Sequence, residues 1–259
     1  MKHWLAIEKL TARNAISERL AYRLDFALSA AFLGVSQIVI PLYTLLLYGV
    51  SEGFPGWSVG EALLLASYVS LAEATASVFF GGVIWQTLRS VQKGTMDTYL
   101  LAPANPLGYL MNRSVDVEDS GRVVFSAAMC AYALYLIQAP WWFIAFLTVY
   151  LVVPVALFAA IAIIASAISI RYVDTWRIYD VIHSIGSLAK YPNTIYPQLA
   201  QTFLLTALPV AVAGYVPLAT MLHQASAWLF LSSAFVVAIL VLSVYYWQTT
   251  LKNYASAGG

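Results

Sequence analysis

The chain has 259 residues, of which 61% are hydrophobic and 10% are charged, whereas a soluble domain carries about 25% charged residues. This composition predicts a protein embedded in lipid, and the net charge of +1 gives no reason to expect a nucleic-acid partner. Cys130 is the only cysteine, which excludes an internal disulfide and a thiolate metal cluster, and the three histidines are too scattered for a metal motif.

The first 24 residues carry too many charges for a cleaved signal peptide, which needs an unbroken apolar core. Apolar side chains such as Trp4, Ile7 and Leu10 recur among the charged ones. This pattern predicts an amphipathic helix over residues 1–24 that stays on the mature protein and lies at the membrane surface.

Six later stretches predict helices that cross a hydrocarbon core of about 30 Å at 1.5 Å per residue. The predicted fold class is therefore an all-α integral membrane protein with six transmembrane helices. The spans are expected at residues 26–48, 62–83, 121–138, 143–170, 176–196 and 226–247.

Residues 171–223 fit two interpretations. In the first, 176–196 is a fifth, partly polar span, and 197–223 is a re-entrant helical hairpin with its breaks at Pro197, Pro209, Gly214 and Pro217. In the second, the polar part lies on the cytoplasmic surface and residues 199–222 cross the membrane. Irregular backbone at membrane depth is tolerated only where protein or water covers it, so the first interpretation requires a protein interface.

The basic residues predict the orientation, because cytoplasmic loops are enriched in Lys and Arg. We expect the protein to lie in the cell (inner) membrane with both termini in the cytoplasm. In that orientation 12 of the 13 basic residues lie on the cytoplasmic side, and loops 51–60 and 138–142 contain none. Lys190 distinguishes the two interpretations, since it would lie inside in the second and near the outer face in the first.

Residues 84–113 form the longest polar interruption. On a helical wheel, Trp85, Leu88 and Val91 fall on one side and Arg89 and Lys93 on the other, which predicts a helix lying along an interface.

A glycine is expected to end this helix at Gly94. A short second helix over residues 96–101 should close before Pro103. From the pattern alone, the segment is either a pair of rigid cytoplasmic helices that contact another protein or an ordinary loop with a lipid-facing amphipathic helix.

Two segments carry a family resemblance. The first is KGTMDTYLLAPANPLGY, with Gly94, Asp97, Leu100, Leu101 and Pro103; the second is LAKYPNTIYPQLAQTFLLTALPVAVAGYVPLATML, with Tyr191, Pro192, Pro197, Pro209, Tyr215 and Pro217. Together with the number and order of the spans, they resemble ABC-2 type transporter permeases, in particular a branch of small six-span permeases. Ala102 departs from that pattern, because the family often places a basic residue before the proline, which puts the details of the partner contact in doubt.

The resemblance implies one permease half of an ABC exporter, paired with a second permease, identical or related, and with two copies of a nucleotide-binding subunit. ATP and Mg would be bound by that subunit, and none by this chain, in which no Gly-Lys pair of a phosphate-binding loop occurs. The resemblance also favours the re-entrant interpretation of residues 197–223.

By the same resemblance, residues 84–113 would be the gate and coupling segment. The gate helix would use Trp85, Leu88 and Val91. The contact with the ATPase would use Leu88, Arg89, Lys93, Gly94, Met96, Asp97, Leu100 and Leu101.

Three side chains are candidates for the translocation path: Glu73, Asp180 and His183. A charged carboxylate at mid-span costs at least about 2.5 kcal/mol, so Glu73 should face a cavity or a partner, or be protonated and hydrogen-bonded nearby. Asp180 and His183 share one face of the fifth span and could instead form a structural network with Arg177. The alternative function is an ion-coupled secondary transporter or channel-like protein with Glu73 and Asp180 as ion or proton sites.

Small residues in the first span, such as Ala30 and Gly34, stand four apart and permit close helix contact, either with a second subunit or within the chain. Trp57, Trp141 and Trp142 predict an aromatic belt at the membrane interface.

Overall fold

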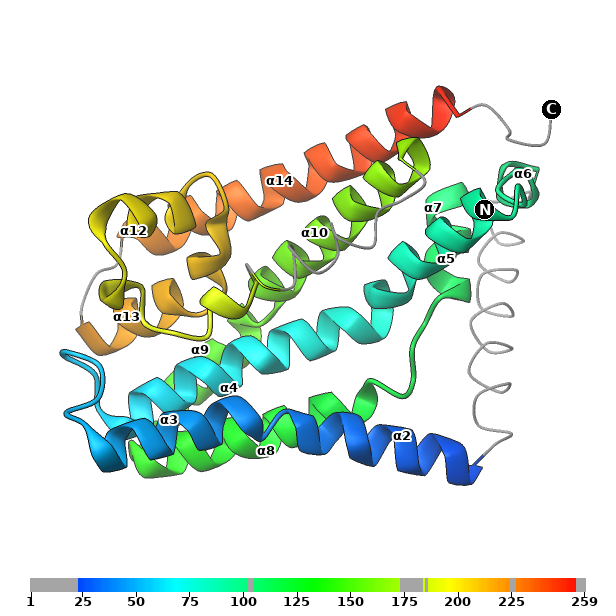
Figure 1. Ribbon diagram of the computed structural model, residues 1–259. Coiled ribbons are helices and arrows are strands. Elements are labelled where there is room, and N and C mark those ends of the chain that lie inside the picture. Colours follow the sequence, from blue (N-terminus) through cyan, green and yellow to red (C-terminus); the bar gives the residue numbers. More distant parts are fainter. Residues whose placement is uncertain (1–22, 102–104, 173–183, 185, 224–226, 255–259) are drawn as a thin grey trace.

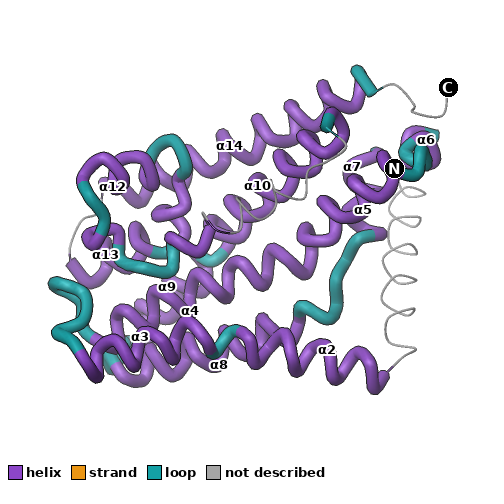
Figure 2. Tube along the Cα trace, in the orientation of Figure 1, coloured by secondary structure: helices purple, strands orange, loops and turns teal. Residues whose placement is uncertain are grey.

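The computed structural model describes residues 23–101, 105–172, 184, 186–223 and 227–254. Within these ranges all regular elements are helices (Figure 2), as the sequence predicts. The predicted interfacial helix of residues 1–24 lies outside the described residues except for its last two positions.

The first apolar stretch forms two helices, α2 (Arg23–Ser36) and α3 (Val39–Val50), where one span over 26–48 is predicted. The break follows from Pro41 in the first turn of α3, because proline has no N–H to donate to a carbonyl of the preceding turn.

The second apolar stretch is longer than predicted. It comprises α4 (Val59–Ala76), a π-helical turn η1 (Ser77–Gly81) and α5 (Gly82–Gln92), which together form a helix of 34 residues. The side chain of Ser58 and that of Glu61 form a capping box at its start.

The polar interruption contains two short helices, α6 (Asp97–Leu100) and α7 (Pro106–Arg113). Gly94 has a φ of +64°, so the prediction that a glycine ends α5 is confirmed. Asn105 caps α7 through its side-chain oxygen, which accepts from two backbone N–H groups.

The next helices are α8 (Ser120–Leu136), α9 (Trp141–Tyr150) and α10 (Val152–Arg171). The helices α9 and α10 follow each other across Leu151 and form one apolar stretch of 31 residues. Pro154 lies just after this junction and removes one backbone donor there.

The last part begins with the short 3-10 helix η2 (Asn193–Ile195). It continues through α12 (Gln198–Leu205), the 3-10 helix η3 (Pro209–Ala213), α13 (Tyr215–His223) and the long α14 (Ala227–Lys252). Of the predicted fifth span, 176–196, residues 176–183 and 185 lie outside the described residues. The described part is helical only to Leu188 and then continues through a turn and η2, so no helix extends to residue 196 as predicted.

The helices form one elongated bundle (Figure 1). In that view α2, α3 and α8 lie at the bottom, α4 and α5 run through the middle, and α10 and α14 lie above. One end of the bundle carries α6 and α7 together with the start of α2 and the ends of α5, α10 and α14. We call it the α5–α7 end. The opposite end carries the loop 51–58, α12 and α13, and we call it the α12–α13 end.

Four helical stretches are long and apolar enough to cross a membrane: Arg23–Val50, Val59–Gln92, Trp141–Arg171 and Leu229–Lys252. Ser120–Leu136 is a shorter apolar helix. These overlap five of the six predicted spans. The fifth predicted span, 176–196, and the re-entrant path of residues 197–223 stay predictions.

The small residues of the first span contact the same chain. Gly121 at the start of α8 lies so close to the backbone of Ala30 that a Cβ on Gly121 would overlap the carbonyl of Ala30, and the ring of Phe125 lies against Gly34. This face of α2 therefore packs on α8. Trp141 and Trp142 are exposed, whereas Trp57 is buried beside Tyr215. The placement of these side chains in an aromatic belt stays a prediction.

Candidate functional site

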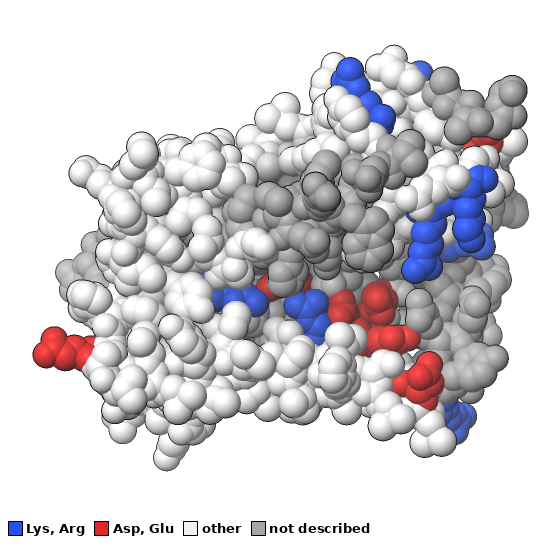
Figure 3. Space-filling view, viewed as in Figure 1, with Lys and Arg blue, Asp and Glu red and all other residues white. Residues whose placement is uncertain are grey.

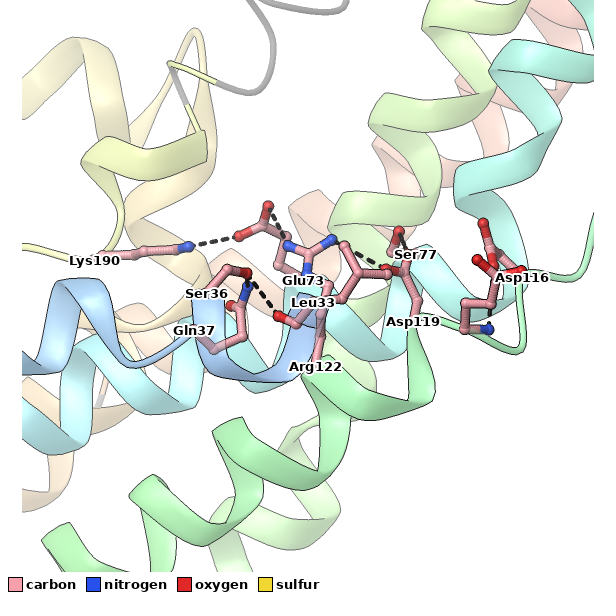
Figure 4. Close-up of polar contacts among 10 residues, drawn as sticks. Leu33, Ser36, Gln37, Glu73, Ser77, Asp116, Asp119, Arg122 and Lys190 are labelled. Atoms are coloured by element: carbon pink, nitrogen blue, oxygen red, sulfur yellow. Dashed lines mark hydrogen bonds and ion pairs between the residues drawn. The ribbon is translucent and has the colours of Figure 1, made fainter. Parts of the chain in front are cut away.

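Two basic side chains hold Glu73 from opposite sides in the interior of the bundle (Figure 4). Lys190 Nζ lies 2.8 Å from Glu73 Oε2, and Arg122 Nη2 lies 3.3 Å from Glu73 Oε1. The Lys190 side chain is 6% exposed, and those of Glu73 and Arg122 are 14% exposed. Each oxygen of the carboxylate is thus matched by a cation in a region of low solvent access.

The pairing continues to a second carboxylate. Arg122 Nη1 lies 3.6 Å from Asp119 Oδ1, and the hydroxyl of Ser77 donates a short hydrogen bond to Asp119 Oδ2. Asp119 precedes α8. Burial raises the pKa of its carboxyl, while the hydrogen bond from Ser77 and the charge of Arg122 act in the opposite direction.

We call Lys190, Glu73, Arg122, Asp119 and Ser77 the charge network. It joins three parts of the fold: the C-terminal half of α4 with η1, the start of α8, and the turn that precedes η2. With two cations and two carboxylates its formal charges balance, so no single unpaired charge is buried. Figure 3 shows basic and acidic side chains in a line across the middle of this face, with further charged side chains toward its right end and one acidic group at its left edge.

The charge network lies between two hollows that both include Arg122. One, of about 420 Å³, is lined by Lys190 and by residues at the break between α2 and α3, including Ser36 and Gln37. The other, of about 80 Å³, lies between Glu73 and α10. Among the described residues, no three His, Cys, Asp or Glu side chains come together as a metal-ligating group.

The geometry differs from the hydrogen-bonded, protonated Glu73 considered from the sequence. The hydroxyl of Ser77 donates to Asp119, and that of Thr75 donates to a carbonyl of its own helix. Both oxygens of Glu73 instead face cations, Lys190 Nζ at 2.8 Å and Arg122 Nη2 at 3.3 Å.

Lys190, which on the sequence alone distinguishes the two interpretations of residues 171–223, has its side chain buried against Glu73. The enrichment of basic residues in cytoplasmic loops does not apply to a lysine that is buried in an ion pair. The choice between the two interpretations stays a prediction.

The remaining path candidates and the re-entrant residues are placed unequally. Asp180 and His183 lie outside the described residues. Pro197 precedes α12 and is exposed, whereas Pro209, Gly214 and Pro217 are buried. A Cβ on Gly214 would overlap the side chains of Leu65 and Val69 of α4, so this break packs directly on the second apolar helix.

The predicted gate helix corresponds to α5, but it continues α4 without a helix end. Its apolar side, with Leu88 and Val91, is buried, and Val91 belongs to a core cluster that includes residues of α10 and α14. Trp85 is half-buried. The helix therefore packs against protein on the side that the wheel assigned to an interface.

The predicted ATPase-contact residues divide into two groups. Leu88 and Met96 are buried and support the fold. The others are at least partly accessible at the α5–α7 end: Arg89, Lys93, Gly94, Asp97, Leu100 and Leu101. Leu101 is 84% exposed, so its side chain is available to a partner.

One core cluster fixes this end of the molecule. Met96 and Tyr99 of the α6 region pack with Leu107 and Leu110 of α7, and the cluster extends to residues of α10 and to Trp247 of α14. Trp247 Nε1 donates to Ser166 Oγ at 3.0 Å, and that hydroxyl is 2.8 Å from the hydroxyl of Thr87 in α5. The ends of α5, α10 and α14 are thereby joined.

Sequence reasoning found Glu73 but missed its partners. Arg122 and Lys190 are each a single basic residue beside an apolar stretch, so the sequence pattern predicts only the side of the membrane on which they lie. The signal that was available was the need of Glu73 for a cation. The sequence does not say which of the thirteen Lys and Arg residues meets that need.

The all-helical fold with its long apolar helices, and the charged side chains enclosed between those helices, define a membrane protein with a polar interior. The family model described as "ABC-2 family transporter protein" matches residues 35–258. The chain belongs to this family of membrane transport proteins. Comparisons with curated proteins and with solved structures give no significant match.

Proposed function

We propose that this chain is the permease half of an ABC exporter, which moves its substrate outward across the inner membrane with ATP hydrolysed on a separate nucleotide-binding subunit. It would pair with a second permease, identical or related, and each half would engage one copy of the ATPase. The N- and C-termini and the α5–α7 end would lie in the cytoplasm, as the distribution of basic residues favours.

The observation that carries this proposal is that α4, η1 and α5 form one long helix whose end bears α6 and α7. A partner that pushes on the exposed Leu101 would press on α6 and α7, which the buried cluster around Met96 and Tyr99 holds together. Displacement of α6 and α7 would then be transmitted along the long helix, because packed helices move as rigid elements.

The π-helical turn gives this long helix a place to bend. Such turns interrupt the regular hydrogen bonding of an α-helix and are frequent at functional sites. The backbone N–H of Asp116 donates to the carbonyl of Val78 at 2.9 Å within this turn, and Ser77 binds Asp119. Movement of α5 would therefore act on the charge network, which lies beside both hollows.

The ion-coupled alternative relies on Glu73 as a proton or ion site. Because both oxygens of Glu73 face cations, binding of a further cation there would be opposed by Lys190 and Arg122. No observation on the described residues favours that alternative over an ATP-driven exporter.

The test is a Leu101→Ser variant, purified from native membranes with whatever ATP-hydrolysing subunit accompanies the permease. Burying a leucine side chain contributes about 1.5–3 kcal/mol, so its loss should weaken the complex roughly 10- to 100-fold. The fold should be retained, because the side chain is already exposed. Co-purified ATPase and permease-stimulated ATP hydrolysis are the measurements.

Leu24→Ser is the matched control, since Leu24 is 82% exposed at the same end of the bundle. It should leave the co-purified ATPase unchanged. Absence of any ATP-hydrolysing subunit from the wild-type preparation would refute the proposed function, and equal retention by Leu101→Ser would refute the contact at α6.

A further inference from the structure

A polar hollow of about 320 Å³ opens at the α5–α7 end, between α5, α6 and α7. We call it the basic hollow. It lies beside the exposed Leu100 and Leu101 of the α6 region. Its lining consists of Gln86, Arg89, Ser90, Lys93, Thr95, Thr98, Tyr99 and Arg113.

Three cations surround the basic hollow, and none of the described residues that line it is acidic. Within the described ranges, Arg89, Lys93 and Arg113 have no carboxylate within ion-pair distance. Arg89 and Arg113 lie in the last turns of α5 and α7, where the helix dipole stabilises a cation. That effect explains each arginine alone, but it leaves three like charges around one space, which attract an anion.

The other lining groups also suit an anion. Ser90, Thr95 and Thr98 bring hydroxyls, and the Gln86 amide donates to the hydroxyl of Tyr99 at 2.6 Å, which leaves the Tyr99 proton available to a further acceptor. An anion in the basic hollow could therefore receive charge-assisted hydrogen bonds from several directions.

The lining also distinguishes between sources of the anion. A phospholipid brings acyl chains that need an apolar wall, and the described residues of the lining include no aliphatic side chain. A carboxylate on a folded partner needs none, and the exposed Leu100 and Leu101 would pack against the apolar surface of such a partner around it.

We propose that the basic hollow receives an Asp or Glu side chain of the nucleotide-binding subunit. This inference rests on the proposed function, and it adds the chemistry of the contact: a partner carboxylate inserts among Arg89, Lys93 and Arg113, while the leucines of the α6 region supply the apolar part of the interface. Because the ion pairs would form at a surface, binding should weaken as ionic strength rises.

The test uses a carbodiimide on native membranes that contain the full-length, tagged permease. The reagent activates a carboxylate, and the amine of Lys93 then displaces the activating group to form an amide, with the reagent released as its urea. We expect mass spectrometry to find Lys93 joined to an Asp or Glu of the ATP-hydrolysing subunit. Lys93→Arg keeps the charge and has no amine that forms this product, so it should lose the adduct.

Charge reversal provides the second measurement. Arg89→Glu/Lys93→Glu places like charges together, which should lower retention of the ATPase at least about tenfold and remove its dependence on salt. Lys252→Glu is the matched control, because Lys252 is an exposed cation at the same end of the bundle and does not line the basic hollow. It should retain the ATPase at the wild-type level.

The outcomes separate the two proposals. A wild-type permease that retains no ATP-hydrolysing subunit overturns both. If the subunit is retained equally by the charge-reversal variant, or if Lys93 is joined instead to the carboxylate of phosphatidylserine or to a different protein, the basic hollow is not the carboxylate site, although the proposed function stands.

Discussion

Replacement of Glu73 by Gln tests the charge network most directly. The change removes the carboxylate that meets both Lys190, at 2.8 Å, and Arg122, at 3.3 Å. Lys190 then remains buried with no matching anion in the network, and Arg122 keeps only Asp119. Removing one partner from a buried ion pair costs about 3–5 kcal/mol, because the remaining charge is left uncompensated.

For a chain of this size, 1 kcal/mol corresponds to roughly 2–4 °C in the melting temperature. Glu73→Gln should therefore lower the apparent melting temperature of the detergent-solubilised protein by roughly 6–20 °C. Thermal unfolding followed by tryptophan fluorescence measures this shift. Glu52→Gln, which removes an exposed carboxylate from the loop 51–58, should change the free energy of unfolding by no more than about 0.5 kcal/mol.

A second substitution separates charge balance from packing. In Glu73→Gln/Lys190→Met the unmatched cation is also removed, so we expect the double variant to recover at least about 1 kcal/mol relative to Glu73→Gln alone. The single variant Lys190→Met completes the comparison. Strict additivity of the effects of Glu73→Gln and Lys190→Met in the double variant, or a shift in melting temperature below roughly 2 °C for Glu73→Gln, would refute the assignment of these residues to one balanced network.

Two further substitutions test the packing of the bundle. Ser166→Ala leaves the buried N–H of Trp247 and a hydroxyl of α5 without their partner. It should lower the free energy of unfolding by about 1–3 kcal/mol. Ser243→Ala is the control, because the Ser243 hydroxyl bonds a carbonyl of its own helix; equal effects of the two substitutions would contradict the cross-helix role of Ser166. Gly121→Ala should cost about 1–3 kcal/mol through overlap with the backbone of α2. A Cβ on Gly49 meets no atom within 4 Å, so Gly49→Ala should be neutral or stabilising. Thermal melts compare the two, and a neutral Gly121→Ala would show that α2 and α8 are not closely packed.

Local signals in the sequence predicted the local structure well. The glycine that ends α5 adopts the expected positive φ, because only the backbone of that one residue decides it. The apolar and polar sides of α5 were also identified correctly. The sequence does not show whether lipid or protein covers the apolar side of α5, because a helical wheel shows only which residues share a face of the helix.

The charge network depends on contacts that no local pattern encodes. Glu73 and Arg122 are 49 positions apart, and Lys190 is farther still along the chain. The break between α2 and α3 has a signal in the sequence, because Pro41 lies inside the predicted span and proline interrupts the hydrogen bonding of a helix. The burial of Trp57 had none, since its ring contact with Tyr215 joins the two loop-rich segments of the α12–α13 end.

The π-helical turn of Ser77–Gly81 sets the direction in which the rest of the long helix faces. One residue of an α-helix turns the chain by about 100°, and a π-turn holds one residue more than the α-turn it replaces. Deleting a single residue there would rotate α5, and with it α6, α7 and the basic hollow, by about a quarter of a turn relative to Glu73. The turn thus fixes the angle between the interior charges and the surface at the α5–α7 end, so length changes at this position should be tolerated far less well than side-chain changes.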